Sequence, residues 1–121
     1  MDFFSWGSSI SVDQLTSAFE RSGINNFELV SGDVLETVPK YVMEHPELKI
    51  SLLNIDIDFF ESNMCCLENF YDLVMPGGVI LLDNYTYAHG DTKSTDKFFA
   101  DKKVLIKKFP FALRPCYIIK E

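Results

Sequence analysis

The sequence has few positive charges and no long apolar run. Eleven Lys and Arg residues stand against eighteen Asp and Glu residues, which gives the 121-residue chain a net charge of −7. Proteins that bind nucleic acid through a general basic field carry the opposite balance, so we do not expect a nucleic-acid partner. No apolar run approaches the roughly 20 residues that a membrane-spanning helix requires, so no membrane association is expected. The first ten residues also lack the basic start and apolar centre of a signal peptide.

Paired cysteines are missing as well. The three cysteines, Cys65, Cys66 and Cys116, are an odd number, and no C-x-x-C spacing occurs. Adjacent cysteines on a helix rarely pair with each other, so we expect reduced, structural thiols in a cytoplasmic protein. Internal repeats and low-complexity tracts are also lacking. With 47% hydrophobic and 14% aromatic residues, the composition indicates one globular domain over residues 1–121.

Two apolar runs organise the middle of the chain. They are Ile50–Ile55 and residues 79–82, and a helix-length segment that closes with Pro76-Gly77-Gly78 lies between them. Both runs are apolar at nearly every position, which is typical of strands that are covered on both faces. The order strand, helix, strand is the βαβ crossover, and this crossover makes the two strands parallel.

Each of these two runs ends in polar side chains. Asp56 and Asp58 follow the first run, and Asp83 and Asn84 follow the second. Parallel strands end at the same edge of a sheet, where α/β proteins bind ligands, so we expect the three acids within several ångströms of one another. Their repulsion is offset by a raised pKa or by a hard cation such as Mg²⁺. The alternative is that the acids are solvated at strand ends or cap the following helices.

The rest of the chain contains further helix and strand signals. In chain order we expect a loop or arm at residues 1–10, a helix at 11–22 capped by Ser11, a strand at 27–30, a helix from Asp33 to about Glu44, a helix from Ser94 or Thr95 to about Asp101, and strands at 104–109 and 116–120. The link between the last two strands is too short for a crossover, so they are antiparallel. The sequence therefore predicts an α/β fold with a parallel sheet and an antiparallel pair at its end.

Five short motifs together resemble the macrocin O-methyltransferase family, which are class I S-adenosylmethionine-dependent sugar O-methyltransferases. The motifs are FELVSGD at 27–33, ETVP at 36–39, LNIDIDFFE at 53–61, PGG at 76–78 and DNY at 83–85. The resemblance runs from about residue 11 to residue 99 and more loosely to the end. The joint pattern is specific, whereas PGG or D-x-D alone is weak.

The resemblance implies a cofactor site and a metal site. Gly32 and Asp33 match the turn that holds the adenine edge of S-adenosylmethionine, and Asp56 joins them among the expected cofactor-binding residues. Asp56, Asp83 and Asn84 match the positions that bind a divalent cation, Mg²⁺ or a similar ion.

The same resemblance implies a catalytic base. Asp58 matches the acid that removes the proton from a sugar hydroxyl. A carboxylate in hydrogen-bond reach can take that proton while the oxygen attacks the methyl sulfonium, and a cation would lower the pKa of the hydroxyl. The expected partner is thus a small-molecule hydroxyl acceptor, such as a sugar.

The chain departs from the family pattern in three places. Asn84 stands where the family usually has Asp, and Phe60 stands where it usually has Tyr. The Gly-rich E/D-x-G-x-G-x-G loop, which approaches the methionine end of the cofactor, is not found in this sequence. The resemblance therefore implies the C-terminal half of a Rossmann-like class I methyltransferase sheet, mostly parallel and truncated at its N-terminal side. In such a half, Ile50–Ile55 is an exposed sheet edge, and we expect a homodimer or a part of a longer chain.

Two other functions stay open. One is a non-catalytic α/β remnant domain that binds a partner or a metal. The other is a different D-x-D chemistry on phosphates or nucleotide sugars, as in haloacid-dehalogenase-type phosphatases. Phe59 and Phe60 argue against the phosphatase, because those enzymes place Thr or Val after the second acid.

Overall fold

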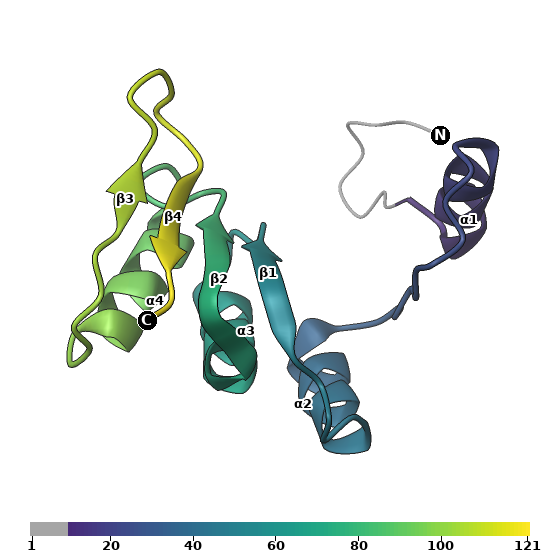
Figure 1. Cartoon of the computed structure of the whole chain (residues 1–121), viewed down its shortest axis with the longest axis horizontal. Helices are drawn as coiled ribbons and strands as arrows, with labels where there is room; N and C mark the ends of the chain where they lie inside the picture. Colours follow the sequence, from purple (N-terminus) through teal and green to yellow (C-terminus); the bar gives the residue numbers. More distant parts are fainter. Residues whose placement is uncertain (1–9) are drawn as a thin grey trace. The chain divides into compact units, whose positions relative to one another are not determined.

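The computed structural model describes residues 10–121, and the chain divides into two compact units, Met1–Gly32 and Asp33–Glu121 (Figure 1). The expected arm at residues 1–10 lies outside the described residues except for Ile10, which is in no helix or strand. Among the described residues, no helix has both the length and the apolar character needed to span a bilayer.

In the first unit, residues 10–32 contain one helix, α1 (Val12–Arg21), and the predicted capping box at its start is confirmed. The backbone N–H of Gln14 donates to Ser11 Oγ at 3.1 Å, and the backbone N–H of Ser11 donates to Gln14 Oε1 at 3.0 Å. The rings of Phe19 and Phe27 pack 4.6 Å apart. The prediction of a strand at 27–30 is wrong. A strand needs a neighbour for its backbone N–H and C=O groups, and the sheet of this protein is built from later segments.

The second unit is a helix-backed sheet. Its elements are α2 (Val34–Glu44), β1 (Ile50–Ile55), α3 (Phe60–Phe70), a 3₁₀ turn (Tyr71–Leu73), β2 (Val74–Leu82), α4 (His89–Phe99), β3 (Lys107–Lys108) and β4 (Cys116–Ile119). The four strands lie in the order β1-β2-β4-β3. The pair β1–β2 is parallel, which confirms the crossover, and the pair β3–β4 is antiparallel, as predicted.

The sheet is mixed, and this differs from the expected mostly parallel sheet. Only β1–β2 is parallel among its three strand pairs, because β4 runs antiparallel to both β2 and β3. Residues 27–30 form no strand.

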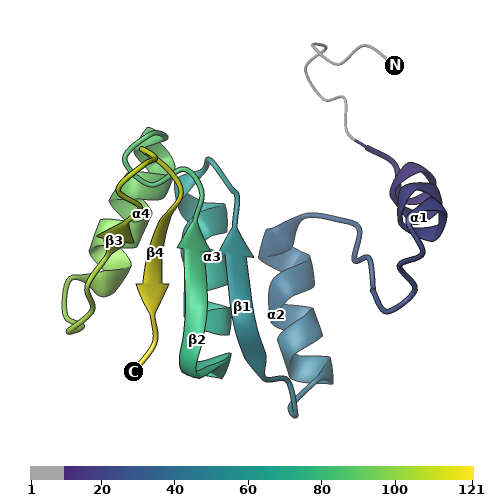
Figure 2. The ribbon, with the colours of Figure 1, turned by 45° about the horizontal axis from the view of Figure 1, so that its top comes forward.

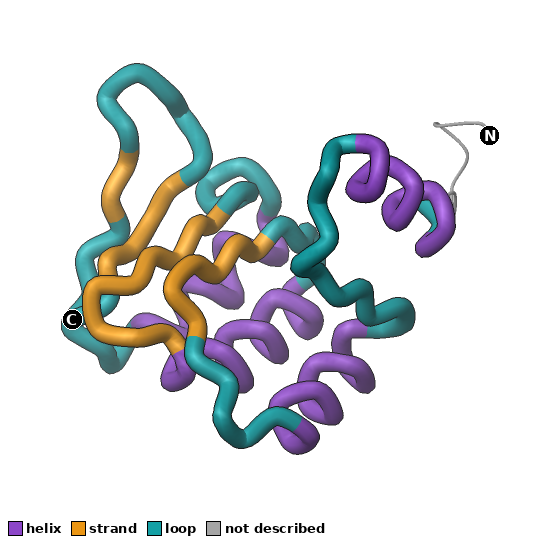
Figure 3. Tube along the Cα trace, turned by 45° about the vertical axis from the view of Figure 1, so that its right-hand side comes forward, coloured by secondary structure: helices purple, strands orange, loops and turns teal. Residues whose placement is uncertain are grey.

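Helices α2, α3 and α4 all lie on one side of the sheet (Figures 2 and 3). The core lies between the sheet and these helices and includes Ile55, Leu67, Ile80, Leu82 and Ile118. Strand side chains alternate between the two faces of the sheet, so every second strand residue points to the face without helices. Leu52 and Ile119, for example, are 59% and 44% exposed.

Strand β1 is the edge of the sheet, as predicted. Gly78 in β2 leaves no room for a side chain, because a Cβ there would lie 2.7 Å from Val74 Cγ1 and 2.8 Å from Met75 O in the same strand and 3.1 Å from Ser51 O of β1. Strand β2 begins at Val74, earlier than the predicted residue 79, so the Pro-Gly-Gly segment belongs to the strand. Strand β3 is confined to two residues of the predicted 104–109.

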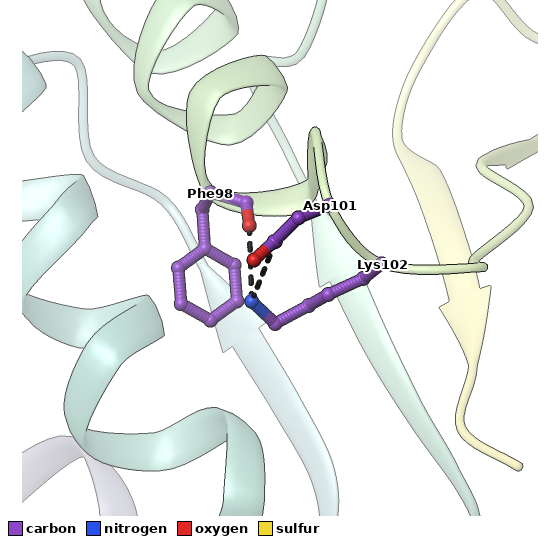
Figure 4. Close-up of polar contacts among 3 residues, drawn as sticks. All are labelled: Phe98, Asp101 and Lys102. Atoms are coloured by element: carbon purple, nitrogen blue, oxygen red, sulfur yellow. Dashed lines mark hydrogen bonds and ion pairs between the residues drawn. The ribbon is translucent and has the colours of Figure 1, made fainter.

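Helix α4 begins at His89, five residues before the predicted start. Ser94 and Thr95, the predicted caps, are instead buried inside the helix, and Ser94 Oγ donates to Gly90 O at 2.9 Å. At the other end, Lys102 Nζ donates to the Phe98 carbonyl at 3.1 Å, lies 3.3 Å from Asp101 Oδ1 and 4.1 Å from the centre of the Phe98 ring (Figure 4). A positive charge at this position stabilises the helix, because the C-terminal end of a helix carries a partial negative charge.

Candidate functional site

The candidate site is the edge of the sheet at which β1 and β2 end together. Ile55 is paired with Leu82, and the backbone N–H of Asp83 donates to Ile55 O at 3.1 Å. Figure 2 shows both arrowheads at the same end of the sheet. The residues after each strand, Asp56 and Asp83, therefore start side by side, as the crossover predicts.

The side chain of Asn84, which follows β2, joins the two acids that follow β1. Its Nδ2 donates to Asp56 Oδ1 at 3.1 Å and to Asp58 Oδ1 at 2.7 Å. Only 6% of Asn84 is exposed. The predicted convergence of these side chains is confirmed, whereas their roles in binding or catalysis stay predictions.

Asp83 completes the cluster, which we call the acidic rim: Asp56, Asp58, Asp83 and Asn84. Partial burial raises the pKa of the Asp83 carboxyl, and its hydrogen bond with Asp56 and the negative charge of Asp56 raise the pKa further. The charge of Asp58 acts in the same direction, while the guanidinium of Arg114 lowers the pKa of Asp83. The like charges at the rim are thus close enough to interact strongly.

Asp91, on α4, supports the rim from inside the protein. It is fully buried, its carboxylate accepts the backbone N–H of Asn84, and its Oδ1 accepts the hydroxyl of Thr95 at 3.1 Å. Burial raises the pKa of Asp91 to about 6, and the hydrogen bonds from Thr95 and Asn84 oppose this rise. Asp91 was not predicted as a site residue, because the helix was expected to begin only at Ser94 or Thr95. The signal was the spacing of Asp91, Ser94 and Thr95, which puts three polar side chains on one face of a helix.

Asn63, on α3, connects the two helices beneath the rim. Its Nδ2 donates to the hydroxyl groups of Ser94 and Thr95 and to Asp91 O, the last at 3.3 Å. Asn63 Oδ1 and Asp91 Oδ2 are buried and have no hydrogen-bond partner among the described residues. This polar cluster fixes α4, and with it Asp91, against α3.

Asp33 starts α2, which confirms the predicted cap. Its Oδ1 accepts the backbone N–H of Leu35 at 3.0 Å. The charge of Asp33 also affects Cys65 on α3. Burial has the largest effect in raising the pKa of the Cys65 thiol, and the negative charges of Glu68 and Asp33 raise it further. Gly32, which belongs to the first unit, has a φ of +131° that favours glycine. The roles of Gly32 and Asp33 at an adenine edge stay predictions.

The rim as arranged does not fit a divalent cation. Within residues 10–121, no group of three or more His, Cys, Asp or Glu side chains is placed to hold a metal ion. Asn84 turns its amide nitrogen, which is a hydrogen-bond donor and not a metal ligand, toward Asp56 and Asp58. The cation site predicted at Asp56, Asp83 and Asn84 is thus without support from the geometry.

A hollow lies close to Asp58. It has a volume of about 510 Å³ and is lined by Phe60, Glu61, His89, Gly90, Lys93 and Lys97. Gly90 packs against the backbone of Asp58, because a Cβ at Gly90 would lie 2.8 Å from Asp58 O. We call this cavity the Lys93–Lys97 hollow. Its two lysines bring positive charge to a protein that is otherwise strongly acidic.

A comparison with known protein families shows which family this chain belongs to. The family model described as macrocin O-methyltransferase (TylF) matches residues 4–108. The chain belongs to the macrocin O-methyltransferase family. The resemblance predicted from the five motifs is therefore confirmed. None of the curated proteins matches the chain.

Solved structures agree with membership in the macrocin O-methyltransferase family. CalS11, a TDP-rhamnose 3′-O-methyltransferase of calicheamicin biosynthesis, is 28% identical in its apo structure, with a TM-score of 0.70 over 75% of this chain and 40% of CalS11. The O-methyltransferase NovP is 20% identical, with a TM-score of 0.80 over 92% of this chain and 45% of NovP, and it shows the fold alone. The chain thus spans less than half the length of these two methyltransferases, which agrees with the predicted partial fold.

Proposed function

We propose that this chain is the part of an S-adenosylmethionine-dependent O-methyltransferase that positions the acceptor hydroxyl and its base. The observation that carries the proposal is the acidic rim, because in a member of this family it gathers acids from two strands at the edge where α/β sheets bind ligands. The Lys93–Lys97 hollow beside the rim offers space for an acceptor.

Asp58 is the base in this proposal. Its carboxylate takes the proton of the acceptor hydroxyl while the hydroxyl oxygen forms a bond to the methyl carbon of S-adenosylmethionine. The bond between that carbon and sulfur breaks, and its electron pair leaves with S-adenosylhomocysteine. The hydrogen bond from Asn84 to Asp58 Oδ1 holds the carboxylate in one orientation, and its other oxygen remains for the hydroxyl.

The proposed contacts to the adenine side of S-adenosylmethionine are Gly32, Asp33 and Asp56. Asp33 is fixed as the cap of α2, whose start lies at the same end of the sheet as the tips of β1 and β2 (Figure 2). The sequence contains no Gly-rich loop for the methionine end of the cofactor. No step of the proposed reaction passes through a cation, because Asp56, Asp83 and Asn84 do not fit one as arranged.

The proposed acceptor is a sugar hydroxyl on a molecule that carries phosphate. CalS11 is named for such a substrate, a nucleoside diphosphate sugar. In this chain, Lys93 and Lys97 are one helical turn apart on α4 and line the hollow together with Gly90, which packs against the backbone of Asp58. Ammonium groups complement phosphate charge.

The test is calorimetry with S-adenosylmethionine and S-adenosylhomocysteine, followed by a methyl-transfer assay. We expect binding of both compounds and loss of transfer in Asp58→Asn without loss of cofactor binding. A chain that binds neither compound at millimolar concentration is not a methyltransferase by itself. That result would favour the second candidate, a non-catalytic remnant domain.

A further inference from the structure

We infer that Asn84 does at the acidic rim what a bound cation would otherwise do, so that Asp56 and Asp58 are held together without metal. Two strand-end carboxylates repel each other unless a positive or partially positive group lies between them. In this protein that group is the Nδ2 amide of Asn84, at 3.1 Å from Asp56 Oδ1 and 2.7 Å from Asp58 Oδ1.

The donor geometry leaves no role for Asn84 as a metal ligand. An amide nitrogen carries two protons, and both are used, one on each carboxylate. Only the amide oxygen of Asn84 binds a hard cation, so ligation on this side requires the amide to turn by about 180°. That turn breaks two hydrogen bonds to charged acceptors, which are the strongest hydrogen bonds that an amide makes. It also brings the amide oxygen against the carboxylate oxygens of the two acids.

The backbone of Asn84 fixes the direction of its side chain. Its N–H donates to the buried carboxylate of Asp91, and its C=O accepts the N–H groups of Tyr87 and Ala88 at 2.9 and 2.8 Å. Asp91 is held in turn by Thr95 and lies fully inside the protein. The backbone of Asn84 is therefore held in place, so its side-chain amide is directed at Asp56 and Asp58. A group that substitutes for a cation needs such a fixed position.

In terms of the reaction, Asn84 is a positioning residue. It acts through Asp58, whose carboxylate it orients toward the acceptor, and this part of the inference rests on the proposed function. The inference that the rim needs no metal does not rest on the proposed function, because this inference concerns only the contacts among the rim residues.

The first experiment is calorimetry with Mg²⁺ and with Mn²⁺ on the wild type, on Asn84→Asp and on Asn26→Asp. The control adds the same charge at an exposed position of the first unit. We expect no binding at millimolar concentration by the wild type or by Asn26→Asp, and binding about tenfold or more tighter by Asn84→Asp, since a third carboxylate replaces the donor. Wild-type binding equal to that of Asn84→Asp would overturn the inference, and so would an Asn84→Asp variant that folds and binds neither metal.

A second readout needs no variant. In ¹⁵N-edited NMR spectra of the wild type, the two Nδ2 protons of Asn84 are expected to be protected from solvent exchange and to keep their shifts when Mg²⁺ is added. Rapid exchange, or a shift that saturates with Mg²⁺, would contradict the hydrogen bonds. A chain that fails to bind S-adenosylmethionine but passes both measurements refutes the proposed function and leaves this inference in place.

Discussion

At the scale of single residues, Asp91 combines full burial with a negative charge. Its unfolded pKa is near 3.8 and burial raises it to about 6 in the folded protein. Between these two pKa values the folded state binds more protons than the unfolded state, so the free energy of unfolding falls as pH rises from about 4 to about 6. Above pH 6 the protein carries the full cost of a buried charge.

Asp91→Asn tests this pH dependence. The free energy of unfolding of this variant, relative to that of the wild type, is expected to be roughly 2–3 kcal/mol larger at pH 8 than at pH 4, because the variant has no carboxyl to ionise. The measurement is urea unfolding across this pH range. Asp101→Asn, at a side chain that is 84% exposed, is the control and is expected to leave the curve in place. Curves for Asp91→Asn and wild type that run parallel would contradict the assigned pKa.

The residues of the site were predictable from sequence to different degrees. Asp56 and Asp83 follow two apolar runs, and the crossover alone brings them together. The hydrogen bonds of Asn84 were not predictable, because the residue type allows both a ligand and a donor role and only the geometry decides. Asn63 and Asp91 were missed because their burial depends on how α3 packs against α4. The spacing of Asp91, Ser94 and Thr95 indicates a shared helix face but not that this face is buried.

At the scale of elements, the parallel pair β1–β2 carries the site, and Gly78 in β2 leaves no room for a side chain. Gly78→Ala is expected to lower the free energy of unfolding by about 1–3 kcal/mol, because its Cβ meets backbone oxygens of Met75 and Ser51. Gly77→Ala is the matched control. It has open space around it but a φ of +83°, so we expect only the conformational cost of about 1 kcal/mol. Thermal unfolding of the two variants gives the comparison, and equal losses would argue against a steric role for Gly78.

Helix α4 presents Lys93 and Lys97 to the hollow next to Asp58. The double variant Lys93→Glu/Lys97→Glu is expected to bind TDP-rhamnose at least about tenfold more weakly, since two favourable contacts with phosphate become repulsive. Lys40→Glu/Lys49→Glu makes the same change of charge at lysines that do not line this hollow and is expected to have a much smaller effect. Equal affinities of the two double variants in calorimetry would remove α4 from the acceptor site.

Local signals predicted the elements well where a cap or an apolar run marks them. Ser11 and Asp33 cap their helices as expected, and β1 has the predicted bounds. The prediction failed where tertiary contacts decide. Ser94 and Thr95 are typical cap residues, yet the buried side chain of Asn63 supplies hydrogen-bond partners that keep them inside α4. Residues 27–30 have strand propensity but no neighbouring strand.

At the scale of the whole molecule, the free edge at β1 is the feature with the largest consequence. A strand with unpaired backbone groups and an exposed leucine favours association with another chain. We predict a homodimer in light scattering after size-exclusion chromatography, and a monomer for Leu52→Lys. Leu113→Lys changes an even more exposed leucine outside the strands and is expected to leave the dimer intact. A wild type that is monomeric at every concentration would contradict this prediction.

The family was predictable from the sequence, because five of its motifs occur together between residues 27 and 85. The mixed sheet was not, since a strand at 27–30 would have needed neighbours that this chain does not provide.

The central claim is that acids from two strands meet at one rim and that Asn84 holds the two acids that follow β1 together without a cation. A crystal structure of the protein grown with Mn²⁺, with anomalous scattering recorded at the manganese edge, tests it most directly. We predict no manganese at the rim and Asn84 Nδ2 in hydrogen-bond contact with both Asp56 and Asp58. Manganese bound by Asp56, Asp83 and Asn84, or side chains of Asp56 and Asp83 that point apart, would contradict the account.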